Sequence, residues 1–305
     1  MDHQTSLSLL KFLPNYTEHM ESNSHRQTNP RLTKMFDAIL DPFQYSFMIR
    51  ALMVSVLVGI MSPIIGAYVI TRGLAFMGDA LAHAVMPGLI IAFLLGVSPF
   101  AGAAPAGIAV AILIGLLTRR TGISEDTTIG IMFAGLFAVG LVLLSLSNDL
   151  PINLEDLLLG QVLGVSWLDV YLTLGLCAFV VFLLSIFHKE LVFSSFDPLG
   201  ARVSGLPTLL LDYLLLVLLA LVVIIALQAV GIVLVMAMLV TPSATAYLLV
   251  RRLPSVMAVG AILGACSAIS GLYLSYYFDI PSGAAMTLVA TTIFCAVAIF
   301  RKRIV

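Results

Sequence analysis

The chain has 305 residues, of which 61% are hydrophobic and only 10% are charged, and its formal net charge is -1. An ordinary soluble domain has about 25% charged residues, so this chain has too few polar side chains to coat a water-soluble globule. The near-neutral charge offers no basic face for nucleic acid, which excludes nucleic-acid-binding proteins as well.

Long apolar runs alternate with short clusters of charged and turn residues along most of the sequence. Several runs reach the roughly 20 residues that cross a bilayer as a helix. Strands of a membrane barrel would instead alternate polar and apolar residues over about ten positions, and no segment has that pattern. The sequence therefore predicts an all-α, polytopic integral membrane protein with about 8–9 transmembrane helices.

The N-terminal residues 1–44 are polar and mixed in charge, and they predict a mobile extension with no cleavable signal peptide. We expect residues 45–305 to form one membrane domain. A segment at 153–165 is too short to span the bilayer and predicts a partial helix near one face. Whether 42–71 gives one span or an interfacial helix plus a span stays open. The apolar stretches lie at 51–71, 77–97, 101–118, 128–147, 170–187, 208–227, 229–250, 255–277 and 283–300.

The basic residues test this alternation, because cytoplasmic loops retain Lys and Arg. All ten basic residues after position 50 fall on one side of the predicted spans: Arg72, Arg119, Arg120, Lys189, Arg202, Arg251, Arg252, Arg301, Lys302 and Arg303. The opposite loops carry only acidic charges, at Asp149, Glu155, Asp156, Asp169 and Asp279. The C-terminus is therefore predicted to be cytoplasmic. The same count puts the N-terminus outside, but five basic residues among residues 1–50 are balanced by five acidic ones, so its orientation stays open.

Asp79 and His83 form a charged pair at the start of the second apolar stretch. A carboxylate inside a bilayer costs about 2.5–3.5 kcal/mol on insertion scales, so it rarely persists without a partner or a polar cavity. On a helix, four-residue spacing places both side chains on one face, one turn apart. An Asp oxygen and an imidazole nitrogen suit manganese, zinc or ferrous iron. The pair therefore predicts a transition-metal site.

Two ligands are too few for a tight metal site. Two copies of the chain facing each other across a two-fold axis would supply four ligands around a central pathway, and this symmetric site is a hypothesis. The alternative is that Asp79 stabilises the helix start and His83 merely supports it. Met77 and Met86 could add thioether ligands, but methionine in an apolar span is more often packing.

The segment 190–207 is predicted to form a cytoplasmic loop with a brief helix. Asp197 and Pro198 supply a start signal, and Gly205 and Pro207 a stop signal. The segment is either an ordinary connecting turn or a docking helix for a soluble partner. The chain has no phosphate-binding Gly-x-x-x-x-Gly-Lys-Ser/Thr loop, so an ATP-driven process would need a motor on another polypeptide.

Small residues and prolines in other spans predict helix contacts and helix shape. Gly260, Gly264 and Ala268 follow a spacing that lets helix backbones approach closely. Pro63 and Pro242 each remove a helical hydrogen bond and bend the span, and we prefer this interpretation over a role in gating. The cysteines Cys177, Cys266 and Cys295 lie in apolar runs without disulfide or metal spacing, and we interpret them as small buried hydrophobes.

Four segments resemble one family of membrane proteins. LAFMGDALAHAVMPG at 74–88 is very similar to the signature of the manganese, zinc and iron permeases of ATP-binding-cassette importers. FDPLGARVSGLP at 196–207 resembles their coupling segment, and VGIVLVMAMLVTPSATA at 230–246 resembles a pair of their core helices. FDIPSG at 278–283 resembles their outer turn. The resemblance covers residues 45–300 and says nothing about the extension.

The resemblance implies an all-helical fold related to the cobalamin and siderophore importer permeases, in a prokaryotic plasma membrane. It implies a homodimer of permeases with cytoplasmic ATPase subunits and an extracytoplasmic metal-binding protein. Asp79 and His83 would be the metal ligands. The coupling residues would be Asp197, Pro198, Gly200, Arg202 and Gly205. No permanently bound cofactor is expected, since the metal is the cargo.

The sequence-based hypothesis is thus an importer permease and not an enzyme. Overall similarity favours manganese as the cargo, with zinc or ferrous iron as alternatives. A stand-alone metal channel or proton-coupled carrier would need more polar residues in several spans, which here offer mainly Gln228 and scattered Ser and Thr. A membrane enzyme would need a His, Asp or Glu cluster drawn from several spans, and none is present.

Overall fold

The structure is a computed structural model that describes residues 41–147 and 164–301. The chain divides after Gln44 into two units, Met1–Gln44 and Tyr45–Val305. The described part of the first unit is a 3-10 turn, η1, at Asp41–Gln44. The predicted partial helix at 153–165 falls almost entirely outside the described residues.

The second unit is helical, and the described residues contain no strand. Among its described helices, four are short: α4 (Met77–Ala84), α5 (Met86–Leu94), α10 (His188–Phe196) and α11 (Pro198–Val203). The long helices are α3 (Ser46–Thr71), α6 (Pro99–Thr121), α7 (Glu125–Leu146), α9 (Trp167–Ile186), α12 (Thr208–Val230), α13 (Ile232–Leu249), α14 (Leu253–Phe278) and α15 (Ser282–Arg301).

Within the described ranges, eight helical segments are long and apolar enough to cross a membrane, and Leu234–Leu249 in α13 is a shorter apolar helix. The all-α prediction with about 8–9 spans is therefore confirmed. One of these spans, Met77–Leu94, consists of α4 and α5 joined at Val85. The segment 42–71 contributes one span, because a single continuous helix runs over Ser46–Thr71.

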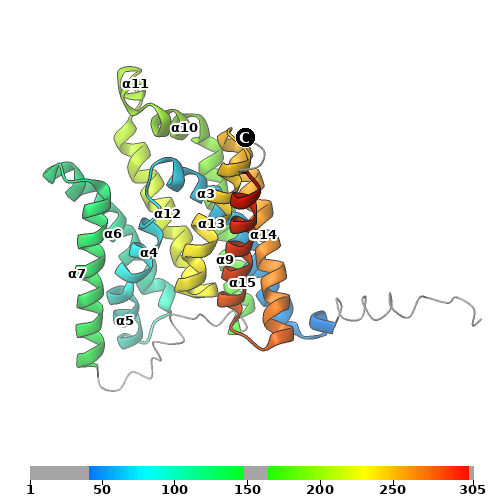
Figure 1. Cartoon of the computed structure of the whole chain (residues 1–305). Helices are drawn as coiled ribbons and strands as arrows, with labels where there is room; N and C mark the ends of the chain where they lie inside the picture. The colour runs from blue at the N-terminus through cyan, green and yellow to red at the C-terminus, as the bar shows by residue number, and fades with distance from the viewer. Residues whose placement is uncertain (1–40, 148–163, 302–305) are drawn as a thin grey trace, which may run out of the picture. The chain divides into compact units, whose positions relative to one another are not determined.

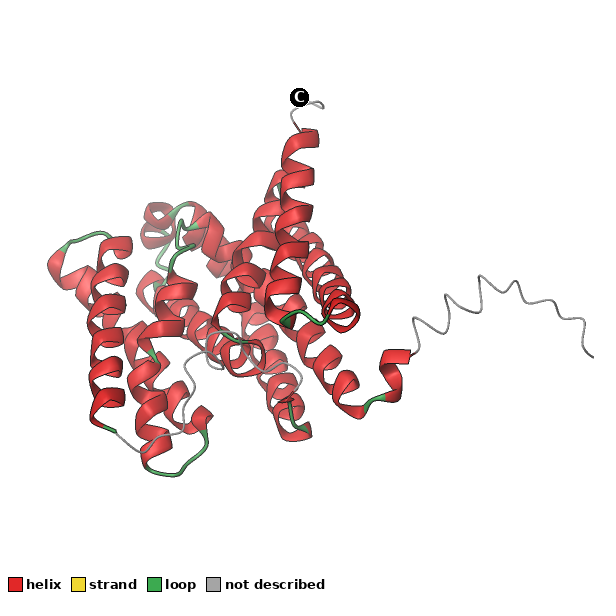
Figure 2. Ribbon diagram, turned by 60° about the horizontal axis from the view of Figure 1, so that its bottom comes forward, coloured by secondary structure: helices red, strands yellow, loops and turns green. Residues whose placement is uncertain are grey.

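The helices form two groups around buried α3 and α12. Figure 1 shows α14 and α15 on one side of the bundle and α4, α5, α6 and α7 on the other, and Figure 2 shows helices joined by loops throughout the described residues. Helix α3 contacts α9, α12, α13 and α14, whereas α4 contacts α6, α7, α12 and α13. The outer helices α7 and α15 are mostly exposed although they are strongly apolar. An apolar outer surface of this kind suits a bilayer or a second membrane subunit.

Helices α3 and α14 approach each other at two glycines, as the small-residue spacing predicts. A Cβ added at Gly59 would lie 2.8 Å from the carbonyl oxygen of Gly264. Pro63 lies in the same contact, 3.1 Å from the position of a Cβ at Gly260. The Ser243 hydroxyl lies 3.0 Å from the carbonyl oxygen of Pro63 and links α13 to α3. Pro63 therefore packs between neighbouring helices, which supports a role in shape.

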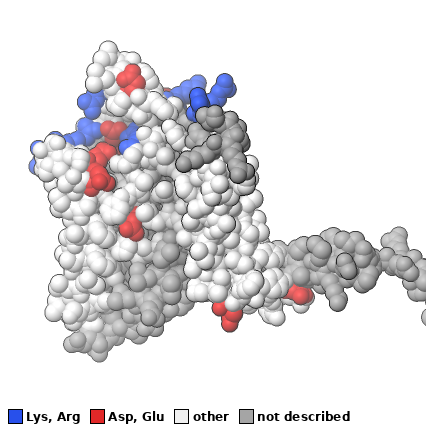
Figure 3. Space-filling view, in the orientation of Figure 1, with Lys and Arg blue, Asp and Glu red and all other residues white. Residues whose placement is uncertain are grey.

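Lysine and arginine gather at one end of the bundle. Figure 3 shows them around the end that carries α10 and α11, and the charged side chains of the second unit visible at the opposite end are acidic. For the described part of the chain, this distribution agrees with the prediction that the basic residues lie on one side of the spans.

The cysteine prediction is partly wrong. Cys177 is buried, but Cys266 and Cys295 are exposed, and none of the three is paired in the part of the chain that the structure describes. Cys266 and Cys295 stand in apolar runs because helix faces that point outwards are apolar too. A bilayer favours apolar side chains on those faces as much as a protein core does.

Candidate functional site

Asp79 and His83 lie on one face of α4, as their spacing predicts. The His83 ring nitrogen Nδ1 lies 3.0 Å from the backbone oxygen of Asp79 and 3.6 Å from its carboxylate oxygen Oδ1. The side chains are 27% exposed for Asp79 and 16% for His83. The pair is thus neither sealed in the core nor freely exposed.

The hydrogen bond to the Asp79 backbone fixes the tautomer of His83 when the ring is neutral. A carbonyl oxygen only accepts, so Nδ1 must carry the hydrogen and donate it. The lone pair then sits on Nε2, which is the atom a metal ion would bind. Nδ1 also faces the Asp79 carboxylate, so Nε2 points away from that carboxylate in this rotamer.

The helix-start interpretation of Asp79 receives limited support. Asp79 lies in the first turn of α4, where the helix dipole favours a carboxylate. However, the N-cap residue is Phe76, and its side chain makes no capping hydrogen bond in the described structure. The one polar side chain recorded beside the Asp79 carboxylate within the described residues is His83.

Two phenylalanines of α7 enclose the His83 ring. Phe133 and Phe137 each meet it edge to face, with ring centroids 5.3 Å away in both cases. The two phenyl rings stack on each other at 6.0 Å, and Phe76 packs against Phe133 at 6.0 Å. Sequence reasoning missed this aromatic wall, because phenylalanine in an apolar span carries no distinguishing signal.

The span that carries the pair is broken just after it. Helix α4 ends at Ala84, and Pro87 stands in the first turn of α5. Broken helices at membrane depth commonly line substrate sites. Met77 and Met86 are buried, which supports the packing interpretation of both methionines.

The structure brings Asp79 and His83 together as a pair. Among the described residues, no group of three or more His, Cys, Asp and Glu could hold a metal ion.

The predicted docking segment forms a short helix, α11, with a defined start. The Asp197 carboxylate accepts a 2.8 Å hydrogen bond from the Gly200 backbone, and Pro198 occupies the first turn. A Cβ at Gly200 would overlap the Asp197 carboxylate, so this carboxylate would have to shift if Gly200 were replaced. Gly205 ends the segment with φ at +80°, a conformation that favours glycine.

The other side chains of α11 divide into an anchored and an exposed set. Arg202 Nε donates a 3.3 Å hydrogen bond to the Thr208 hydroxyl at the start of α12. In contrast, Leu199 and Val203 are 75% and 85% exposed. Figure 1 shows α11 projecting from the end of the bundle. An exposed apolar pair on a projecting helix is typical of a protein-binding surface.

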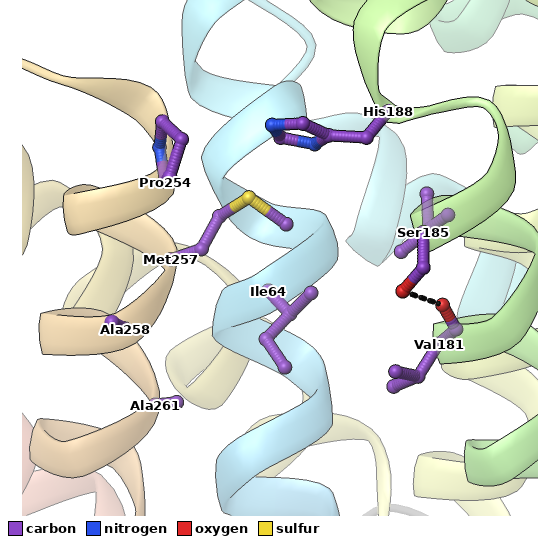
Figure 4. A pocket seen from close by; sticks show the side chains of 9 residues that line it. Ile64, Val181, Ser185, His188, Pro254, Met257, Ala258 and Ala261 are labelled. Carbon is purple, nitrogen blue, oxygen red and sulfur yellow. Dashed lines mark hydrogen bonds between the residues drawn. The ribbon is translucent and has the colours of Figure 1, made fainter.

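A cavity of about 460 Å³ lies elsewhere, between α3, α9, α10 and α14. Figure 4 shows Met257 and Val181 on opposite sides, with Ile64 on the helix between them and His188 at one end. The ring of His188 is hydrogen-bonded through Nδ1 to the Tyr68 hydroxyl at 2.8 Å. Because Asp79 and His83 do not line this cavity, it is separate from the candidate metal site.

Comparison with known proteins gives consistent matches over most of the chain. The family model of the ABC 3 transport family matches residues 44–301. The manganese transport system membrane protein MntC of Halalkalibacterium halodurans is 45% identical over 272 residues, which cover 89% of this chain and 92% of that protein. The chelated iron transport system membrane protein YfeD of Yersinia pestis is 35% identical, covering 88% and 90% of the two chains.

A solved structure agrees with these matches. In the structure of PsaBC from Streptococcus pneumoniae in complex with Fab, one chain is 36% identical to this one and superposes with a TM-score of 0.77. The match covers 86% of this chain and 95% of that chain.

Proposed function

The chain belongs to the ABC 3 transport family, and we propose that it is the membrane-spanning permease of an ATP-driven importer that carries a divalent transition metal, manganese by preference, into a prokaryotic cell. The observation that carries the metal assignment is the pair of Asp79 and His83, one helical turn apart in a broken membrane helix. The similarity to a manganese transport protein over 89% of the chain supports the cargo.

The donor set fits manganese, zinc and ferrous iron, since all three accept oxygen and imidazole ligands. The general stability order favours zinc over manganese at equal geometry, so the two ligands alone do not select manganese. The preference rests on the manganese relative, while the iron relative makes ferrous iron the alternative cargo.

We propose that His83 turns when the metal binds. In the rotamer of the structure Nδ1 faces Asp79, so Nε2 and the carboxylate do not point at a common position. Rotation of the ring would break its bond to the Asp79 backbone and bring Nε2 towards the ion. A second permease across a two-fold axis would supply another Asp79 and His83, which would complete four ligands.

The remaining subunits follow from the family and from the chain's own surface. Separate ATPase subunits would bind and hydrolyse ATP and contact α11 through Leu199 and Val203. An extracytoplasmic binding protein would deliver the metal at the opposite end. The C-terminus and α11 would then lie in the cytoplasm, where the basic residues gather. We assign residues 1–44 to an extension and 45–305 to the permease domain.

The test is uptake of radioactive manganese, zinc and iron by cells that make this chain together with its ATPase and binding protein. Asp79→Ala and His83→Ala are each expected to lower uptake at least about tenfold when equal amounts of protein reach the membrane. Mutation of residues that only support metal ligands already lowers metal affinity or activity by about that factor. Asp169→Asn is the matched control, because this carboxylate caps α9 far from the pair in sequence. Full uptake by either alanine variant would refute the site, and the competing rates identify the metal.

A further inference from the structure

Three charged side chains from three helices meet near the end of the bundle that carries α10 and α11. The Asp212 carboxylate of α12 accepts a 2.8 Å hydrogen bond from Arg72 Nη1 and a 2.7 Å hydrogen bond from Arg119 Nη2, one at each oxygen. We name Arg72, Arg119 and Asp212 the charge cluster.

The charge cluster is partly shielded from solvent. One carboxylate joins two guanidinium groups, and the side chains of Arg72, Asp212 and Arg119 are 14%, 26% and 34% exposed. Arg119 also lies over the ring of Tyr213, 5.7 Å from its centroid. Ion pairs in such surroundings are screened weakly, so their geometry resists change more than that of surface pairs.

Arg72 connects the charge cluster to the docking segment. Its Nε donates a 2.9 Å hydrogen bond to the hydroxyl of Ser195 in α10. That hydroxyl in turn donates to the Leu191 backbone at 2.6 Å, which holds it against its own helix. Helix α10 leads directly through Asp197 into α11. A displacement of α11 therefore acts on the Arg72 guanidinium through one short helix.

The same arginine connects the charge cluster to the metal helix. Arg72 is the C-cap of α3, and five residues later α4 begins. The turn between them is closed by backbone hydrogen bonds, from Leu74 to Val69 at 2.9 Å and from Met77 to Leu74 at 2.9 Å. A turn with these bonds transmits a shift of Arg72 to the start of α4, which carries Asp79 in its first turn.

We propose that the charge cluster positions Asp79 and His83 by linking them to α10 and α11, so that movement of the docking segment is converted into movement of the metal site. Arg72 and Asp212 are positioning residues in this arrangement, since neither contacts the cargo. The inference rests on the proposed function, because it assumes an ATPase that moves α11.

The test uses the complete transporter, with its ATPase and binding protein, reconstituted in liposomes, and records manganese uptake and ATP hydrolysis in the same preparation. In Asp212→Asn both guanidinium groups lose their charged partner, while the size of the side chain and one acceptor oxygen are kept. We expect ATP hydrolysis to stay within about twofold of wild type while uptake per ATP falls about tenfold, a size common for coupling between sites. Asp212→Glu, which restores the charge, should recover part of the ratio.

Asp169→Asn is the control, because it makes the same chemical change to a carboxylate that accepts two bonds from Ser166, at 2.9 and 2.7 Å, at the start of α9. If Asp212→Asn does not assemble, Arg119→Gln is measured by the same criterion. A variant that takes up as much manganese per ATP hydrolysed as wild type overturns the proposal, including one in which uptake and hydrolysis fall in proportion. A wild-type transporter that hydrolyses ATP but moves neither manganese, zinc nor iron overturns the proposed function instead.

Discussion

Gly264→Ala should separate α3 from α14 and destabilise the protein. An added Cβ would overlap the carbonyl oxygen of Gly59 and lie 2.9 Å from Cγ of Pro63. A backbone oxygen inside a helix cannot rotate away, so one helix has to shift. Overpacking of a core typically costs about 1–3 kcal/mol. Because the obstacle is backbone, we expect a value at the upper end, about 3 kcal/mol.

The assay for Gly264→Ala is thermal unfolding of the purified protein in detergent. A cost of about 3 kcal/mol corresponds to a decrease in Tm of roughly 6–12 °C, at about 2–4 °C per kcal/mol for a chain of this size class. Gly175→Ala in α9 is the control, since among the described residues no atom lies within 4 Å of a Cβ placed there. Equal Tm values for the two variants would refute the inferred close approach.

Three further predictions concern single contacts. Asp197→Ala removes the acceptor of the Gly200 backbone and should destabilise α11 by about 1 kcal/mol, measured as faster amide hydrogen exchange in that helix; unchanged exchange would contradict the cap. Leu199→Glu should leave Tm unchanged but weaken binding of the ATPase subunit at least about tenfold in a titration, and unaltered affinity would argue against docking on α11. Ser243→Ala leaves the Pro63 carbonyl without its partner on α13 and should cost about 1 kcal/mol in thermal unfolding, whereas Ser243→Thr, which keeps the hydroxyl, should cost less.

The sequence predicted the features that depend on local spacing. The four-residue interval predicted that Asp79 and His83 lie on one helical face. The hydrogen bond between the His83 ring and the Asp79 backbone, one turn apart, agrees with that spacing. Asp197 and Gly205 likewise marked the ends of α11, because caps and left-handed turns are set by neighbouring residues.

Features that depend on distant residues could not be predicted in the same way. Asp212 lies 140 positions from Arg72 and 93 positions from Arg119, and no local pattern pairs them. The exposure of Cys266 and Cys295 was missed for a different reason. A helix face that meets lipid has the same apolar composition as one that meets protein, so hydrophobicity does not separate the two.

The projecting tip of α11 also affects how the protein can be produced. Leu199 and Val203 lie outside the candidate membrane spans, so water surrounds them until a partner covers them. A permease synthesised in excess would carry this uncovered apolar patch on every surplus copy. Such copies adhere to one another and to chaperones, and proteases remove them. We therefore expect the yield of folded permease to follow the supply of the proposed ATPase subunit, with co-expression of the two raising the yield more than stronger expression of the permease alone.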